Sequence, residues 1–354
     1  MIVYPFSFIK ESIPPSPTPT PTTTATPTPT VTPTPTPTPS ATPVPLWVAG
    51  GRGTNTLAYS TNGLVWSGSS NGNSLFTQCD TVVWNGSIWV AGGQGGSNRI
   101  VYSTDGRSWS ASTNGNSIFT SSVNYIAWNG SIFVAGGSGT NVLGYSTDGL
   151  VWSASTNGNS LFTSIVLGVG WDGTKWVAGG NGTNKLAYST DGITWSASTN
   201  GSSVFTSSAI VRGITTNGSR WIAGSTLSTN FLGYSDDGIT WSASTNGNSV
   251  FSNIYGTAWD GTKYLAAGGG NMLGYSSNGL VWSASTNGST MFTTRGNEIA
   301  WNGSLLVAVG DGTNKIVYSS NGITWTVSTN GNSIFTTEAL GIASKPAPNL
   351  YPPR

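Results

Sequence analysis

The chain has 354 residues, carries a net charge of +1, and only 7% of its residues are charged. Its 13 Lys and Arg residues are scattered, so the basic patch that nucleic acid or an anionic membrane would need is missing, and we expect neither partner. The absence of histidine and the single cysteine exclude a His/Cys metal cage and an intrachain disulfide. No stretch approaches the roughly 18 apolar residues of a membrane span.

Residues 1–13 are predicted to form an N-terminal docking or anchor β-segment. Ile2, Tyr4, Phe6 and Phe8 fall on one face of an extended strand, which suits pairing with an exposed sheet edge. We expect head-to-tail docking on a neighbouring copy. Docking on a different anchor protein, disorder and a secretory signal are the alternatives, although the segment lacks a basic start and a small-residue cleavage site.

Residues 14–45 alternate proline with threonine or serine. Proline restricts φ and removes hydrogen-bond donors, which predicts an extended polyproline II stalk with a reach of about 100 Å. Ser/Thr-Pro composition is also typical of O-glycosylated extracellular stalks. An unglycosylated disordered linker is the alternative.

Residues 46–345 repeat the sequence Tyr-Ser-x-(Asp/Asn)-Gly-x-x-Trp seven times, with its tryptophans at Trp66, Trp109, Trp152, Trp195, Trp241, Trp282 and Trp325. The spacing of 41 to 46 residues is the length of one four-stranded antiparallel sheet with its turns. In the second full copy we expect strands over 124–128, 131–137, 141–146 and 150–155. Asn-Gly and Asp-Gly turns join them, with positive φ expected at both central residues.

The two ends of the array complement each other, since it begins on a second strand and ends on a first strand. Leu340 to Ser344 is predicted to pair beside Trp47 to Gly50. The sequence therefore predicts an all-β, seven-bladed β-propeller of four-stranded antiparallel blades with three-plus-one ring closure and almost no helix. A Pro-rich C-terminal tail, residues 346–354, follows.

The repeat resembles the Asp-box (BNR-like) blade of sialidase-like and photosystem-assembly-factor-like β-propellers. The resemblance implies that the Ser and Asp of each box brace the turn between the third and fourth strands, and that the Trp packs between sheets. The matching residues are Ser103, Asp105, Gly106 and Trp109; Ser146, Asp148, Gly149 and Trp152; Ser189, Asp191, Gly192 and Trp195; and Ser235, Asp237, Gly238 and Trp241. Each copy is one residue shorter between Asp and Gly, and three copies carry Asn62, Asn278 or Asn321 in place of Asp.

This exchange with asparagine indicates a structural rather than a catalytic role for the box, since both side chains accept backbone hydrogen bonds in turns. A glycosidase would need a pair of carboxylates at a defined separation. The acids outside turns and boxes are Asp80, Glu298, Asp311 and Glu338, and the arginines occupy unlike places in different copies. We therefore expect no enzyme, no catalytic residues and no cofactor or metal.

The position three residues after each connector phenylalanine varies most between copies. It holds Arg295 and Glu338 in adjacent copies, which we expect to pair at an exposed site. The connector Ser-Thr-Asn-Gly-(Asn/Ser)-Ser would present seven polar loops, as in propeller lectins, or would simply turn the chain between blades. Most of the Asn-x-Ser/Thr glycosylation sequons coincide with Asn-Gly turns.

The function expected from the sequence is that of a structural subunit of an extracellular, cell-surface or virion-surface fibre. Its propeller head would stand on a stalk, and its N-terminal strand would dock on a neighbouring subunit. A stalk-mounted carbohydrate-binding propeller, a lectin or adhesin with glycans as partners, is the alternative. A sialidase-like glycoside hydrolase is the third and weakest hypothesis.

Overall fold

The computed structural model describes residues 14–16, 47–206 and 208–345. The chain divides into two compact units, Met1–Thr42 and Pro43–Arg354. In the first unit only Pro14, Pro15 and Ser16 are described, and they are exposed and without regular structure. The N-terminal docking residues Ile2, Tyr4, Phe6 and Phe8, nearly all of the stalk and the C-terminal tail lie outside the described residues. No helix among the described residues is both long and apolar enough to cross a membrane.

The second unit is all-β apart from single helical turns, and its strand pairings are antiparallel throughout. Its strands form seven four-stranded units within the described residues. The first three units in chain order are β4 (Gln78–Trp84), β5 (Trp89–Gln94), β6 (Ile100–Ser103), β7 (Ser110–Ala111); β8 (Ser122–Trp128), β9 (Phe133–Ser138), β10 (Leu143–Ser146), β11 (Ser153–Ala154); and β12 (Ile165–Trp171), β13 (Trp176–Asn181), β14 (Leu186–Ser189), β15 (Ser196–Ala197).

The next three units repeat this order, and the remaining one combines both ends of the described array. These four units are β16 (Ile210–Thr216), β17 (Trp221–Thr226), β18 (Leu232–Ser235), β19 (Ser242–Ala243); β20 (Phe251–Trp259), β21 (Tyr264–Gly270), β22 (Leu273–Ser276), β23 (Ser283–Ala284); β24 (Arg295–Trp301), β25 (Leu306–Asp311), β26 (Ile316–Ser319), β27 (Thr326–Val327); and β28 (Glu338–Ser344) with β1 (Trp47–Arg52), β2 (Leu57–Ser60), β3 (Ser67–Gly68).

A four-residue helical turn links each outer strand to the next inner strand. These turns are α1 (Gly72–Leu75), α2 (Gly115–Ile118), α3 (Gly158–Leu161), α4 (Gly201–Val204), α5 (Gly247–Val250), α6 (Gly288–Met291) and α7 (Gly331–Ile334). They are the only helices among the described residues, which agrees with the low helix content predicted from the composition.

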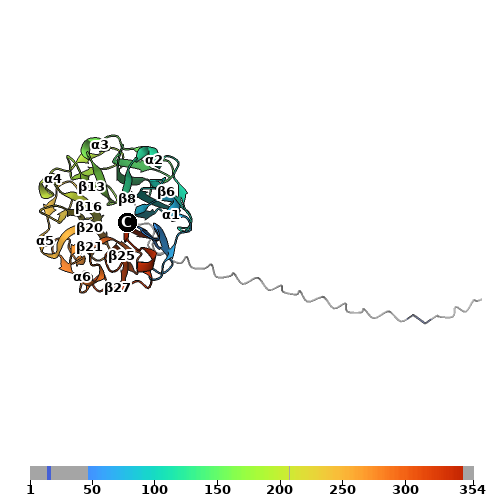
Figure 1. Ribbon diagram of the computed structural model, residues 1–354. Helices are drawn as coiled ribbons and strands as arrows, with labels where there is room; N and C mark the ends of the chain where they lie inside the picture. The colour runs from blue at the N-terminus through green and yellow to red at the C-terminus, as the bar shows by residue number, and fades with distance from the viewer. Residues whose placement is uncertain (1–13, 17–46, 207, 346–354) are drawn as a thin grey trace, which may run out of the picture. The chain divides into compact units, whose positions relative to one another are not determined.

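The units are arranged in a ring with β8, β16 and β20 near its centre (Figure 1). Each innermost strand contacts the next one along the chain, and β28 contacts β4, so the inner strands form a closed cycle. β28 pairs with β1 in the predicted way, with Trp47 opposite Ser344 and Gly50 opposite Gly341. The β-propeller and its three-plus-one closure are therefore as predicted.

The hairpin turns differ from the prediction. In the first turn of the unit that begins at β8, Trp128 pairs with Phe133, which leaves a four-residue loop. Only Gly130 in that loop has a positive φ, of 99°. The side chain of Asn129 accepts the N–H groups of Ser131 and Ile132 at 2.9 and 2.8 Å. Asn129 therefore acts through its side chain rather than through a left-handed backbone, and the expectation of positive φ at both residues was wrong.

The hydrophobic core is divided among the spaces between adjacent units. One cluster joins Val90 and Ile100 of one unit to Phe119, Phe133 and Trp152, which lie in or just before the next unit. Six further clusters within the described residues likewise combine a box tryptophan and a connector phenylalanine with aliphatic residues of two adjacent units. Each unit thus buries its faces against its neighbours, which is the physical reason that a ring of such sheets is stable.

Candidate functional site

The Asp-box residues form a compact hydrogen-bonded turn. In the second full copy the Asp148 carboxylate accepts the N–H groups of Leu150 and Val151 at 2.8 and 2.9 Å and the Ser146 hydroxyl at 3.0 Å. The Ser146 oxygen in turn accepts the N–H of Gly149 at 2.8 Å. The same contacts recur around Ser103 and Asp105, Ser189 and Asp191, and Ser235 and Asp237.

The electrostatics of the box agree with a bracing role. Partial burial raises the pKa of Asp148, but the backbone N–H donors of Val151 and Leu150 and the Ser146 hydroxyl outweigh it, so the pKa lies below its ordinary value. Asn62 accepts the corresponding N–H groups at 2.9 and 3.0 Å in a box without a carboxylate. The negative charge is therefore not needed for the turn.

Each box tryptophan is locked to the connector of the preceding unit. The backbone N–H of Trp152 donates to the side-chain oxygen of Asn114 at 2.7 Å, and the Asn114 side-chain amide donates to the Trp152 carbonyl at 2.8 Å. Asn330 and Trp66 make the same pair of bonds, at 2.9 and 2.8 Å, between opposite ends of the array. The repeated motif therefore holds neighbouring units together and also fastens the closure of the ring.

The connector loops use much of their hydrogen-bonding capacity internally. Besides the contacts of Asn114, the Asn116 side chain accepts the N–H of Arg99 at 2.8 Å and donates to the Ser97 carbonyl at 2.6 Å. The amide groups that a lectin would use to bind sugar in these loops are thus already engaged. The geometry favours the alternative in which the connectors turn and brace the chain.

The residues that differ between copies converge on the axis of the ring. In six of the seven innermost strands the pairing register shifts at the third residue, a β-bulge that leaves this residue outside the ladder. In β20, which begins two residues earlier, the corresponding shift leaves out the fifth residue, Tyr255. These seven residues, together with Tyr125 and Glu298 from the fourth position, line a pocket of about 70 Å³. The residues that line it are Asp80, Asn124, Tyr125, Leu167, Arg212, Tyr255, Asn297, Glu298 and Leu340.

Two carboxyl groups in this axial pocket are strongly affected by burial. Burial raises the pKa of Glu298 to about 8, against a hydrogen bond from the Ile299 backbone that lowers it. Burial also raises the pKa of Asp80 to about 7, although hydrogen bonds from Gln78 and Gln94 and the charge of Arg212 oppose the rise. Both acids therefore carry a proton for part of the time near neutral pH.

Arg212 is the basic residue of the axial pocket. Its guanidinium lies over the Tyr255 ring, 5.2 Å from the centroid, and Arg295 lies 5.0 Å from the same centroid. Burial lowers the pKa of Arg212, while the charges of Tyr255 and Asp80 raise it and that of Arg295 lowers it further. No ion pair joins Arg212 to Asp80 among the described residues, so their charges interact without direct contact.

Glu338 forms a second charged cluster close to the pocket. Its carboxylate binds Arg52 at 2.7 Å and Arg295 at 2.6 Å. The pairing of Arg295 with Glu338 is as predicted, but the Glu338 side chain is only 3% exposed, so the expectation of an exposed pair was wrong. Removing either partner of such a pair is costly because it would leave the buried Glu338 carboxylate less well paired, while the partly exposed arginines reduce that cost.

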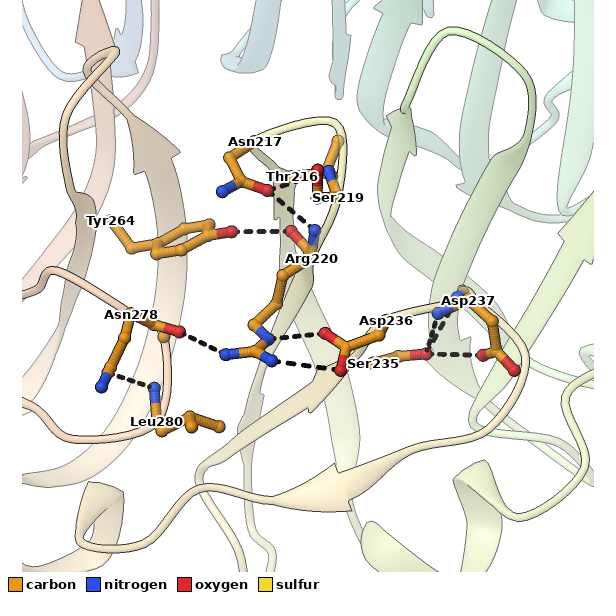
Figure 2. Close-up of polar contacts among 12 residues, drawn as sticks. Thr216, Asn217, Ser219, Arg220, Ser235, Asp236, Asp237, Tyr264, Asn278 and Leu280 are labelled. Atoms are coloured by element: carbon orange, nitrogen blue, oxygen red, sulfur yellow. Dashed lines mark hydrogen bonds and ion pairs between the residues drawn. The ribbon is translucent and has the colours of Figure 1, made fainter.

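Arg220 makes a different kind of asymmetric contact, at the box end of the ring (Figure 2). Its guanidinium binds both carboxylate oxygens of Asp236, at 2.6 and 3.1 Å, and donates to the Asn278 carbonyl of the next unit at 2.8 Å. Tyr264 donates its hydroxyl to the Arg220 carbonyl at 2.8 Å. These contacts tie two units together, and the groups involved are bonded to one another, so we interpret them as structural.

A hollow of about 230 Å³ lies beside the box at Asp105 and Trp109. It is larger than the axial pocket, but its box residues have counterparts in the other copies, and the Asp105 carboxylate is engaged in the turn. Among the described residues, no three His, Cys, Asp or Glu side chains are grouped as a metal site would require. The axial pocket is therefore the candidate site that the structure distinguishes from the repeat.

Comparisons with known proteins agree with the fold. Residues 60–170 match a family described as the DUF6242 beta propeller domain. A structure of YCF48 bound to D1 peptide has a TM-score of 0.52 and 16% identity, covering 74% of this chain and 85% of that one. YCF48 from Cyanidioschyzon merolae has a TM-score of 0.49 and 16% identity over 71% of this chain and 84% of that one.

The GH74 enzyme from Niastella koreensis has a TM-score of 0.37 and 21% identity, covering 85% of this chain and 50% of that one. No curated protein matches the chain in sequence. At these identities the likeness concerns architecture alone. The chain is a β-propeller.

Sequence reasoning named Asp80 and Glu298 as acids outside turns and boxes but did not bring them together. It noted Arg212 only as one of the arginines in unlike places and passed over Tyr255. The missed signal was positional. Asp80 and Arg212 occupy the third place of their innermost strands, Glu298 the fourth, and Tyr255 the fifth place of the longer β20. At the corresponding places other copies carry leucine, asparagine or glycine. Comparing the copies by strand register would have found them.

Proposed function

We propose that this protein is a binding protein whose propeller head receives a small polar ligand at the axial pocket. The observation that carries the proposal is the asymmetry of the pocket. Boxes and connectors repeat almost unchanged around the ring, whereas the charged residues Asp80, Arg212 and Glu298 occur once each in the lining of the axial pocket. Buried titratable groups with shifted pKa values, gathered in one cavity, are typical of functional sites.

The axial pocket and the start of β1 lie toward opposite ends of the inner strands. The described part of the second unit begins at Trp47, which lies opposite Ser344 at the end of β28. Leu340, which lines the pocket, precedes Ser344 by four residues, or about 13 Å of strand. The chain therefore enters the ring at one end of the inner strands, and the pocket lies toward the other.

We propose binding rather than catalysis. A glycosidase must surround a sugar ring with its two carboxylates, and ligand sites of that kind have volumes of roughly 300 Å³ or more. The axial pocket has about 70 Å³. This volume suits a small ligand or the polar end group of a larger one.

The experiment is a thermal-shift panel of glucose, galactose, N-acetylglucosamine, glycine, ethylamine, formate, acetate and phosphate. It compares the native chain with Arg212→Gln, and uses Arg107→Gln, an arginine that stacks on Tyr59 outside the pocket, as the matched control. We expect at least one compound to raise the Tm of the native chain and of Arg107→Gln but not of Arg212→Gln. Equal shifts in all three proteins, or none in any, would contradict the proposal.

A role as subunit of an extracellular or virion-surface fibre is a second proposal, and the sequence of the N-terminal 45 residues favours it. The alternating apolar face of Ile2, Tyr4, Phe6 and Phe8 suits strand docking on a second copy, and the Pro/Thr segment suits a spacer. Removal of residues 1–12 should leave soluble single heads in electron micrographs. Filaments that persist unchanged after this deletion would contradict head-to-tail docking.

A further inference from the structure

Arg212 has an unsatisfied donor beside the axial pocket. It lines the cavity from β16, and its Nε is inaccessible to solvent and has no hydrogen-bond partner among the described residues. Its one described contact is the stacking on Tyr255. A buried donor on a charged group that lacks a partner destabilises a protein by about 1–3 kcal/mol or more. A ligand that accepts this hydrogen bond would recover that free energy.

The acids of the pocket do not supply the missing acceptor. Asp80 accepts hydrogen bonds from the side-chain amides of Gln78 at 2.6 Å and Gln94 at 3.3 Å. A hydrogen bond from the Ile299 backbone lowers the pKa of Glu298, and the charge of Glu298 raises the pKa of Tyr125. Neither acid forms an ion pair with Arg212 among the described residues.

Arg295, the other cation beside Tyr255, is in a different state. Its guanidinium binds the Glu338 carboxylate at 2.6 Å, and Glu338 also binds Arg52. Arg295 therefore shares one buried carboxylate with Arg52, and its own Nε also lacks a partner among the described residues. Arg295 is not among the residues that line the pocket, so the positive charge in the lining is that of Arg212.

On the basis of the binding function proposed above, we infer that the axial pocket holds a small oxyanion, bound through the guanidinium of Arg212. A planar guanidinium is the side chain best suited to an oxyanion, because it donates two parallel hydrogen bonds. The cavity of about 70 Å³ has room for only a few non-hydrogen atoms. The oxyanion is a free ion such as formate or phosphate, or the carboxylate end of a larger molecule.

The neighbouring groups predict that binding is linked to protons. Near pH 6 Asp80 and Glu298 are largely neutral, since burial raises their pKa values to about 7 and about 8. A neutral carboxyl group can donate a hydrogen bond to an anion, whereas a carboxylate repels it. Cys79, Tyr125, Tyr255, Arg295 and Glu338 are further titratable or charged groups near Arg212, Asp80 and Glu298. We therefore expect tighter binding at pH 6 than at pH 8.5, by about tenfold or more.

The test follows the arginine Nε–H signals of the full chain by ¹H–¹⁵N NMR during titration with sodium formate or sodium phosphate. Sodium chloride at equal ionic strength is the reference, and Arg212→Gln assigns the signal. We expect the Arg212 signal to shift and saturate with either oxyanion at pH 6, while the signals of Arg295 and Arg107 stay within the chloride response. Arg212→Lys keeps the charge but loses the paired donors and should bind more weakly.

Three outcomes separate the inference from the proposed function. We call the ¹H–¹⁵N signals of the residues that line the pocket the axial signals. If the Arg212 signal responds to formate no more than to chloride, while the axial signals shift with glucose or ethylamine, the oxyanion inference is wrong and the proposed binding function stands. If the axial signals respond to none of these probes, both are wrong. A galacturonate titration that saturates at lower concentration than acetate identifies the oxyanion as a carboxylate on a larger ligand, and equal affinities identify a free ion.

Discussion

Replacement of Glu298 by glutamine should make the protein more stable at high pH and leave it unchanged at low pH. Burial raises the pKa of this carboxyl from its ordinary value of 4.5 to about 8. Between these values the folded protein holds a proton that the unfolded chain has released. Stability therefore falls as pH rises through this window, and the full penalty is present above pH 8. Glutamine has the same shape and never ionises, so the variant avoids the penalty.

The size of the effect follows from the two pKa values. A change from 4.5 to about 8 corresponds to about 5 kcal/mol, an upper limit because water entering the pocket relieves part of the penalty. We expect the variant and native proteins to agree within about 0.5 kcal/mol at pH 4 and the variant to be more stable by about 2–4 kcal/mol at pH 9. Asp80 titrates in the same direction in both proteins, so it cancels in the difference.

Urea unfolding at pH 4, 6, 8 and 9 measures this difference, and an unchanged m-value shows that the same transition is compared. Asp148→Asn is the matched control, because the pKa of Asp148 lies below its ordinary value. The stability from such a carboxylate is present above the unfolded pKa and is lost as pH falls, so the control should show the opposite sign or none. Equal stability of Glu298→Gln and the native protein at pH 9 would refute the argument from burial.

Three further predictions concern the contacts that hold the ring. Asn330→Ala removes both hydrogen bonds to Trp66 and should destabilise the protein by about 1–3 kcal/mol, as measured by urea unfolding. An unchanged urea midpoint would mean that the pairing of β28 with β1 closes the ring without these two hydrogen bonds. Asp148→Asn should change the free energy of unfolding at pH 7 by no more than about 0.5 kcal/mol, because Asn62 makes the equivalent hydrogen bonds in its own box. A larger loss of stability, measured by thermal melting, would show that the negative charge contributes. Glu338→Gln should lower the free energy of unfolding by about 2 kcal/mol. This value is reduced for solvent screening, because the Arg52 side chain is 47% and the Arg295 side chain 31% exposed. An unchanged free energy in chemical unfolding would show that water satisfies the two arginines.

Much of the fold was predictable because local signals repeat. Asn129-Gly130 and Asp148-Gly149 mark turns whatever surrounds them, and seven copies of these signals reinforce one another. The pairing of Trp47 with Ser344 followed from the two incomplete ends of the array. The fourth strand of the second full copy was predicted too long, because the box turn takes up Leu150 to Trp152 and leaves only Ser153 and Ala154 in the ladder.

The axial pocket was not predictable from the same signals. Counting from the connector phenylalanine aligns Cys79 with Ser122, whereas the strand pairing aligns Cys79 with Val123, since these two lie opposite Gly93 and Gly137. An error of one residue moves a side chain to the other face of a strand. Strand register, rather than distance along the chain, therefore decides which residues reach the axis.

The repeated connector asparagines and the unrepeated Arg212 differ in how far their hydrogen-bonding groups are satisfied. The pair of hydrogen bonds between Asn330 and Trp66 has a counterpart at each of the other six boxes. In every pair the side-chain oxygen and nitrogen of the connector asparagine are both bonded to the tryptophan backbone, so this amide has little hydrogen-bonding capacity left for a ligand. Arg212 occurs once, at a bulge where the ring needs no arginine, and its Nε is left without an acceptor among the described residues. A buried guanidinium with an unmet donor destabilises the fold, so a ligand that completes it is the simplest physical reason for it to be there.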